Sequence, residues 1–275
     1  MKAGIDRGTS RIKAVWRKAD GEYGYLASSD ADEVAVALVA NGVTHARVTG
    51  IGGWPSSDRI EITRCTDDPV ADEIALQADG ARKMFGRDLP PGGFLLVSVG
   101  TGTSYTMVPA EGRQVRFPLG NSIGGGFIEG LGLLQGLDVG EIGPLAEQGT
   151  PLDLLVKHLV PSKAGSFEGE LVVSNFGGVA NPGLIGYAHA SEGGRIEDIC
   201  ATIVHCAAVA VIRDALILGM IPGFAADDVV FIGTPVAKLA PLRGHLGRYA
   251  ASLGKRAHFP EKGAYAAALG ALYAD

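Results

Sequence analysis

The sequence predicts an α/β protein built from two related halves, each with a mixed β-sheet. Short apolar runs alternate with segments of helical spacing along its 275 residues, which is typical of this fold class. The segment 94–108 has the turn Gly100-Thr101-Gly102-Thr103 between two apolar runs, and the segment 3–15 has Gly8-Thr9-Ser10 in the same place. A Gly-rich hairpin by itself is most often only a hairpin. Because the pattern occurs twice, it favours two half-domains whose turns hold the phosphates of one nucleotide.

Composition narrows the classes of protein further. Hydrophobic residues make up 47% of the chain, enough to bury a large core. A formal net charge of −6 without a basic run argues against nucleic acid as the main partner. The cysteines are widely spaced and match no zinc pattern, which is typical of reduced thiols in a cytoplasmic protein. They are Cys65, Cys200 and Cys206.

Neither the N-terminus nor the longest apolar stretch favours a membrane protein. The first strand is expected to begin at residue 3, which leaves no room for a signal peptide. The apolar stretch 199–218 contains His205, Arg213 and Asp214, and charged side chains favour a buried helix over a membrane span.

The elements are expected in the following order. The first half should contain the hairpin at 3–15, strands at 22–27, 46–51 and 60–64, and helices at 31–41 and 71–85. The run Pro90-Pro91-Gly92-Gly93 breaks the chain, so we expect domains at 1–90 and 91–275. The second half should contain strands at 94–99, 103–108, 114–117, 172–174, 229–235 and 257–259, and helices at 125–131, 144–148, 153–159, 196–218 and 263–273. The last helix is free to pack back on the first half.

Charged residues near the two turns are candidates for metal binding, phosphate binding and acid–base catalysis. The Asp6 carboxylate would repel a phosphate directly, but the position suits Mg²⁺ held through water. Lys13 could stabilise phosphate charge, or it could simply be solvated. Glu73 lies in the first turn of a helix, where an acidic residue often only complements the helix dipole; the functional interpretation is a general base for an attacking alcohol. Arg116 could clamp a carboxylate or lie on a sheet edge.

The segment 120–131 is a glycine-rich turn that leads into a helix. The free N–H groups of a helix N-terminus bind anions, although small residues also allow tight helix packing. The six histidines have no metal-ligand spacing, and His205 is interpreted as a core residue. The sequence has no Walker A loop, no nucleophile elbow and no dinucleotide fingerprint between a strand and a helix, so the nucleotide site must belong to another architecture.

Taken in order, these motifs resemble the type II pantothenate kinases over nearly the whole chain. The motifs are 4–13, 72–80, 99–104, 123–131, 174–177, 230–234 and 259–272. The resemblance implies the actin/hexokinase-like fold, with two ribonuclease-H-like domains and a nucleotide cleft between them. It also implies a cytoplasmic homodimer that uses ATP and Mg²⁺ to phosphorylate the primary hydroxyl of pantothenate, the first step of coenzyme A biosynthesis. No nucleic acid or membrane partner is expected.

The resemblance also implies roles for individual residues. Glu73 would be the catalytic base, and Asp6 would hold Mg²⁺ through water. Arg116 and Ser122 would contact the substrate. The residues implied to contact ATP and its metal are Asp6, Gly8, Thr9, Ser10, Lys13, Gly100, Thr101, Gly102, Thr103, Gly125, Gly126, Phe127, Ile128, Glu129, Gly233 and Thr234.

Two departures from the family leave the substrate open. The first turn has one glycine where the family has two, and Arg7 adds bulk and charge there. Arg116 stands four residues before Gly120, whereas the family has three. The alternatives are a kinase of another small alcohol, such as pantetheine or a sugar derivative, and a non-catalytic ATP-binding regulator. A related fold activates dehydratases through an iron–sulfur cluster, but the cysteines here do not supply its pattern.

Overall fold

The first half of the protein is a five-stranded mixed sheet. The computed structural model describes residues 1–52, 54, 59–65, 69–189 and 194–274. The strands of this sheet are β1 (Lys2–Arg7), β2 (Ile12–Arg17), β3 (Tyr23–Ser28), β4 (His45–Gly50) and β5 (Glu61–Arg64). They lie in the order β3-β2-β1-β4-β5. Strands β1, β2 and β3 pair antiparallel, whereas β4 pairs parallel with both β1 and β5.

A second five-stranded sheet repeats this topology. Its strands are β6 (Phe94–Val99), β7 (Thr103–Val108), β8 (Val115–Arg116), β11 (Asp228–Ile232) and β12 (Arg256–His258). Read from β8, the order is β8-β7-β6-β11-β12, with β6, β7 and β8 antiparallel and β11 parallel to β6 and β12. The predicted duplication is therefore confirmed, and so is the expected parallel pairing of the apolar strand β11.

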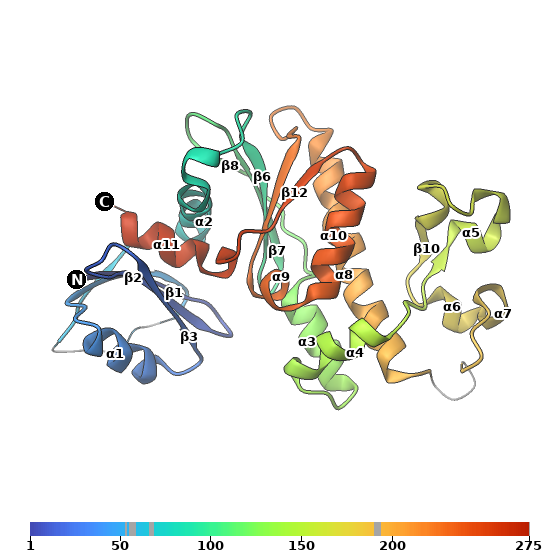
Figure 1. Cartoon of the computed structure of the whole chain (residues 1–275), viewed down its shortest axis with the longest axis horizontal. Coiled ribbons are helices and arrows are strands. Elements are labelled where there is room, and N and C mark those ends of the chain that lie inside the picture. Colours follow the sequence, from blue (N-terminus) through green and yellow to red (C-terminus); the bar gives the residue numbers. More distant parts are fainter. Residues whose placement is uncertain (53, 55–58, 66–68, 190–193, 275) are drawn as a thin grey trace.

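Helices cover both sheets in layers (Figure 1). Helix α1 (Ala31–Ala40) packs on the outer face of the first sheet, and α8 (Ile196–Gly219) and α10 (Ala240–Ser252) pack on the far face of the second. Helices α2 (Pro69–Phe85) and α11 (Ala266–Tyr273) lie between the two sheets. The remaining helices of the second half include α3 (Gly125–Leu134), α4 (Val139–Gln148) and α9 (Thr234–Lys238).

Each of the central helices α2 and α11 packs on the sheet of the other half of the chain. Helix α2 precedes the second sheet in sequence, yet its Ala78 and Ala81 lie in a core cluster with that sheet's strands. Helix α11 ends the chain and packs on β1 and β2 through Ala268 and Leu269. The last helix thus contacts the first sheet, and the domain boundary at residue 90 stays a prediction.

Glycines set how closely the central helices approach. A Cβ on Gly80 of α2 would lie 1.9 Å from the carbonyl oxygen of Ala266, and a Cβ on Gly270 of α11 would lie 2.0 Å from that of Leu76. Any side chain at either position would therefore push the two backbones apart. Helix α2 also contacts β4 of the first sheet.

A smaller unit stands apart from the sheets (Figure 1) and contains β9 (Leu154–Leu155), α5 (Val156–Leu159), η2 (Pro161–Lys163), η3 (Glu168–Glu170), β10 (Val172–Ser174), α6 (Gly177–Ala180) and α7 (Pro182–Ile185). It is anchored to α8 by buried polar groups: the Thr150 N–H donates to Asp198, the Leu152 N–H donates to Thr202, and His205 pairs with Asp153. His205 is thus a hydrogen-bonded core histidine, as expected. The expected helix at 153–159 is wrong at its start, because 154–155 pair with β10.

Helix α8 is the one helix in the described part of the chain that is long and apolar enough to cross a membrane. Its most apolar window has a mean hydropathy of 1.8, and 67% of that window is buried inside the protein. It therefore packs as a core helix of the second half, in agreement with the interpretation of the charged residues within it.

Candidate functional site

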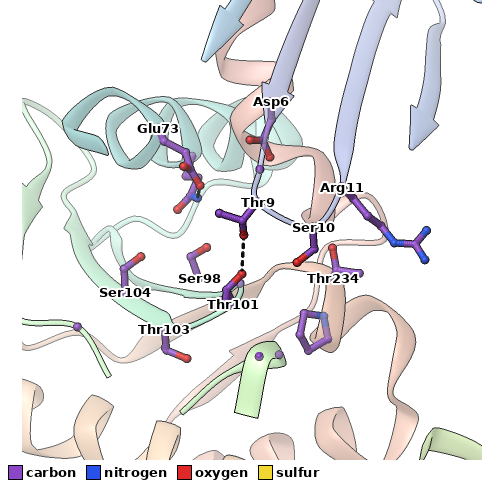
Figure 2. A pocket seen from close by; sticks show the side chains of 18 of the residues that line it. Asp6, Thr9, Ser10, Arg11, Glu73, Ser98, Thr101, Thr103, Ser104 and Thr234 are labelled. Atoms are coloured by element: carbon purple, nitrogen blue, oxygen red, sulfur yellow. Dashed lines mark hydrogen bonds between the residues drawn. The ribbon is translucent and has the colours of Figure 1, made fainter. Parts of the chain in front are cut away.

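A cleft of about 360 Å³ lies between the two sheets, where the two predicted phosphate turns face each other (Figure 2). The hydroxyls of Thr9 and Thr101 are hydrogen-bonded at 3.0 Å across the cleft. The motifs Asp6-Arg7-Gly8-Thr9 and Ser98-Val99-Gly100-Thr101 occupy matching positions in the two sheets, so the bonded threonines are equivalent residues of the duplicated hairpins. The repeat seen in the sequence thus converges on one site.

The third glycine loop packs directly on the second turn. The Gly125 N–H donates to the Gly100 carbonyl at 2.7 Å, and the Gly126 N–H donates to the Thr101 carbonyl at 2.9 Å. A Cβ on Gly124 would lie 2.8 Å from the Thr101 carbonyl oxygen, so this contact requires glycine. The two loops therefore form one wall of the cleft.

Asn121 holds this wall in place and was not among the predicted site residues. Its Nδ2 donates to Asp214 of α8 at 2.6 Å, and its Oδ1 accepts the Ile123 N–H at 2.8 Å. Its backbone forms two further hydrogen bonds with Thr103, both 2.8 Å long. Asn121, which also lines the cleft, thus joins a strand end through its backbone to a loop and a distant helix through its side chain.

Two carboxylates project into the cleft from the first half (Figure 2). Asp6 lies at the end of β1, is 4% exposed and accepts a hydrogen bond from Lys13 Nζ at 3.3 Å. Burial raises the pKa of Asp6, and the Lys13 charge opposes that shift. Its other oxygen, Oδ1, is buried without a hydrogen-bond partner among the described residues.

Glu73 projects from the first turns of α2 towards the two phosphate turns (Figure 2). Burial and the nearby Asp6 charge raise the pKa of Glu73 to about 7, against the smaller effects of Lys13 and of the hydrogen bond from Gln77. Gln77 Nε2 donates to Glu73 Oε1 at 3.0 Å one turn further along α2. A carboxyl group that titrates near neutral pH is suited to accept a proton from an alcohol.

The structure brings together most of the predicted site residues. Those that line the cleft are Asp6, Gly8, Thr9, Ser10, Lys13, Glu73, Gly100, Thr101, Gly102, Thr103, Arg116, Gly125, Gly126, Glu129 and Thr234. Gly233 lines a separate cavity of about 50 Å³, which Asp6 and Glu73 also line.

Three predicted residues do not line the cleft. Ile128 is buried in the core of the second half, Phe127 packs against that core, and Ser122 is exposed. In helix α3 only one face can point at a ligand, so a run of consecutive residues cannot all line the cleft with their side chains.

Sequence reasoning missed several residues that line the cleft. The signal for Ser98 was its place in the repeated motif, where it matches Asp6. The signal for Gln77 was its position four residues after Glu73, which places both side chains on one helix face. No local pattern pointed to Asn121, because its partner Asp214 is 93 residues away.

The donor set fits a hydrated Mg²⁺ better than a metal held only by protein. No group of three or more His, Cys, Asp or Glu side chains could hold a metal in the part of the chain that the structure describes. Mg²⁺ beside a nucleotide typically needs only one or two carboxylates, with water and phosphate as the other ligands. The unpartnered Oδ1 of Asp6 matches that requirement.

Comparison with known proteins finds relatives that match the chain over its whole length. The chain is 28% identical over 283 residues to the type II pantothenate kinase of Staphylococcus haemolyticus, with 99% of both chains covered. It is 26% identical over 286 residues to the type II pantothenate kinase of Staphylococcus aureus, with 100% of both covered. No protein-family model matches the sequence.

Among solved structures, the chain is similar to the activator of the 2-hydroxyisocaproyl-CoA dehydratase from Clostridium difficile with bound ADPNP. The TM-score is 0.64 and the identity 19%, over 99% of this chain and 93% of that one. This similarity concerns the fold, which is that of the actin-like ATPases. The chain is a homologue of the type II pantothenate kinases along its whole length and has the actin-like ATPase fold.

Proposed function

We propose that this protein is an ATP-dependent kinase that phosphorylates the primary hydroxyl of pantothenate, the first step of coenzyme A biosynthesis. The observation that carries the proposal is the position of Glu73, a carboxyl group with a pKa of about 7 that faces two Gly/Thr turns. The homology to type II pantothenate kinases supports the choice of acceptor. A nucleotide analogue bound to a structural neighbour supports the use of a nucleotide.

In the proposed reaction the turns of both halves bind the nucleotide, and Glu73 acts on the acceptor. The turns at 8–10 and 100–102 hold the ATP phosphates through N–H groups and hydroxyls, and Lys13 stabilises their charge. The oxygen of the acceptor hydroxyl attacks the γ-phosphorus, the bond from that phosphorus to the bridging oxygen breaks, and ADP leaves. Glu73 accepts the hydroxyl proton, and Gln77 holds its carboxylate in place. Mg²⁺, held through Asp6, would neutralise charge on the phosphates.

Arg116 is the proposed contact for the pantothenate carboxylate. It ends β8, which pairs with β7 through Thr106, and it lines the cleft in spite of the extra residue before Gly120. A guanidinium can bind a carboxylate through two parallel hydrogen bonds. Ser122 is exposed and lies outside the cleft lining, so we assign it no contact with the substrate.

We also propose that the protein is a cytoplasmic homodimer. Several large apolar side chains of the small unit that stands apart from the sheets are exposed, and exposed apolar surface suits a protein interface. They are Leu159, Val160, Phe167, Leu171, Val173, Val179 and Leu184. Light scattering after size exclusion tests this: a mass near twice the 28.3 kDa of the chain is expected, and a mass of one chain refutes it.

The kinase proposal is tested with purified protein, ATP, Mg²⁺ and a panel of alcohols. Phosphorylated pantothenate, identified by mass spectrometry and dependent on Mg²⁺, is the expected product. Turnover of pantetheine or a sugar in place of pantothenate would keep the kinase and replace the acceptor. ATP binding without turnover of any acceptor in the panel would favour a regulator.

A further inference from the structure

Arg7 is a cation in the cleft wall to which the proposed reaction gives no task. It ends β1, between Asp6 and the first phosphate turn, and lines the cleft. Its Nε is buried and has no hydrogen-bond partner among the residues that the structure describes. Within the same residues, no carboxylate forms an ion pair with it, whereas the neighbouring Lys13 is paired with Asp6.

Two glycines lie against Arg7, one beside its backbone and one beside its side chain. Arg7 pairs with Gly50 across the sheet, and a Cβ on Gly50 would lie 2.3 Å from the Arg7 carbonyl oxygen. A Cβ on Gly52 would lie 2.3 Å from Arg7 Nε. The Gly50 contact involves the strand backbone and does not depend on the residue at position 7, whereas a side chain at position 52 would displace the Arg7 side chain from this conformation.

Burying part of a guanidinium without a partner is costly. A donor shielded from water loses its hydration and gains nothing in return. Four cationic residues line the cleft, Arg7, Arg11, Lys13 and Arg116, against three carboxylates, Asp6, Glu73 and Glu129. With Lys13 and Asp6 paired, the cleft wall has a surplus of positive charge that an anionic ligand would balance.

We propose that Arg7 is an anion-binding residue that takes one oxyanion of a ligand in the cleft through its guanidinium. The inference rests on the proposed kinase function for the choice of ligands. Two ligands of that reaction carry suitable oxyanions: the phosphates of Mg·ATP and the carboxylate of pantothenate. The planar fork of an arginine suits both groups.

The test compares Arg7→Met, Arg7→Lys and the wild type. Methionine keeps an unbranched stem beside Gly52 and removes the donors, and lysine keeps the charge without the fork. Arg17→Met is the matched control, since it removes a positive charge from the exposed end of β2, outside the cleft lining. Mg·ATP affinity is measured by calorimetry. KM is measured for pantothenate and for pantothenol, in which a hydroxymethyl group replaces the carboxylate.

If Arg7 holds a phosphate, Arg7→Met weakens Mg·ATP binding by about 10- to 100-fold and changes the two acceptors alike. If it holds the acceptor carboxylate, the KM for pantothenate rises by about the same factor while that for pantothenol does not change. Arg7→Lys should recover part of either loss, and Arg17→Met should match the wild type.

Changes below about threefold in both measurements would overturn the inference, because the loss of a charged hydrogen bond exceeds that limit. A wild type that turns over neither acceptor refutes the proposed function but leaves the calorimetric comparison intact. In that case Mg·ATP affinity alone decides the role of Arg7, with tenfold weaker binding as support and unchanged binding as refutation.

Discussion

Replacing Glu73 by glutamine is the sharpest test of the proposed chemistry. The change removes the base and keeps the size of the side chain. It also keeps an oxygen for the hydrogen bond from Gln77, which is 3.0 Å long in the structure. We therefore expect Glu73→Gln to bind Mg·ATP at least as well as the wild type, so that any loss of activity reports on proton transfer.

The expected loss follows from the role and the pKa of the carboxyl group. A general base contributes about 10²- to 10⁴-fold to a rate. Because the pKa of Glu73 is about 7, the base is about half ionised at neutral pH. The wild-type kcat/KM should rise about tenfold per pH unit below 7 and level off above it. Glu73→Gln should lose the activity, and its remaining kcat/KM should no longer rise with pH below 7.

The assay follows ADP release between pH 5.5 and 9 with saturating Mg·ATP and varied pantothenate. Glu129→Gln is the comparison variant, since Glu129 also lines the cleft and its substitution removes the same charge. The kcat/KM of Glu129→Gln should still rise with pH and level off near pH 7. Activity within tenfold of the wild type in Glu73→Gln, or a rise of its kcat/KM with pH below 7, would refute the assignment of the base.

The same substitution should change stability in the opposite direction. In the folded protein the pKa of Glu73 is raised from 4.5 to about 7, so ionising this carboxyl group destabilises the fold. The cost is absent below pH 4.5, grows between pH 4.5 and 7 and is complete above 7, where it reaches at most about 3 kcal/mol. Glu73→Gln should therefore raise the free energy of unfolding at pH 8 and leave it unchanged at pH 4.5. Urea unfolding without nucleotide measures this, and equal stabilisation at both pH values would contradict it.

Three further predictions concern the frame of the site. Gly80→Ala should destabilise the protein by about 1–3 kcal/mol or more, because it forces α2 and α11 apart. Gly244→Ala is the control: it lies in a helix with open space around it and should stabilise the protein by up to about 1 kcal/mol. Thermal unfolding compares the two variants, and equal effects would exclude the proposed crossing. Asp6→Asn should abolish the dependence of ATP affinity on Mg²⁺, as judged by calorimetry with and without the ion; an unchanged Mg²⁺ dependence would remove Asp6 from the metal site. Asp214→Ala should leave the Asn121 side chain without its partner and raise the KM for ATP by about 10-fold. The dependence of kcat/KM on pH that Glu73 causes should not change. An unchanged KM would show that Asn121 needs no such support.

Local patterns were sufficient for most elements and for the two turns. Strands β6 and β7 lie at 94–99 and 103–108, as predicted, because each is a short apolar run bounded by Gly/Thr turn residues. Helix α10 was not predicted, since Gly244 and Gly247 weaken its helical signal. Its spacing of Leu242, Leu246 and Ala250, all buried, was the pattern that could have found it.

Only the tertiary structure decided which groups act together. The raised pKa of Glu73 depends on burial and on Asp6, which is far away in sequence, and the support of Asn121 comes from α8. The lack of a partner for Arg7 Nε among the described residues likewise depends on the elements packed around it. The sequence by itself determined the duplicated hairpins and their turn chemistry, because these depend on neighbouring residues. Electrostatics and hydrogen-bond satisfaction depend on distances and burial that form only when the two halves meet, and the local pattern of residues does not contain them.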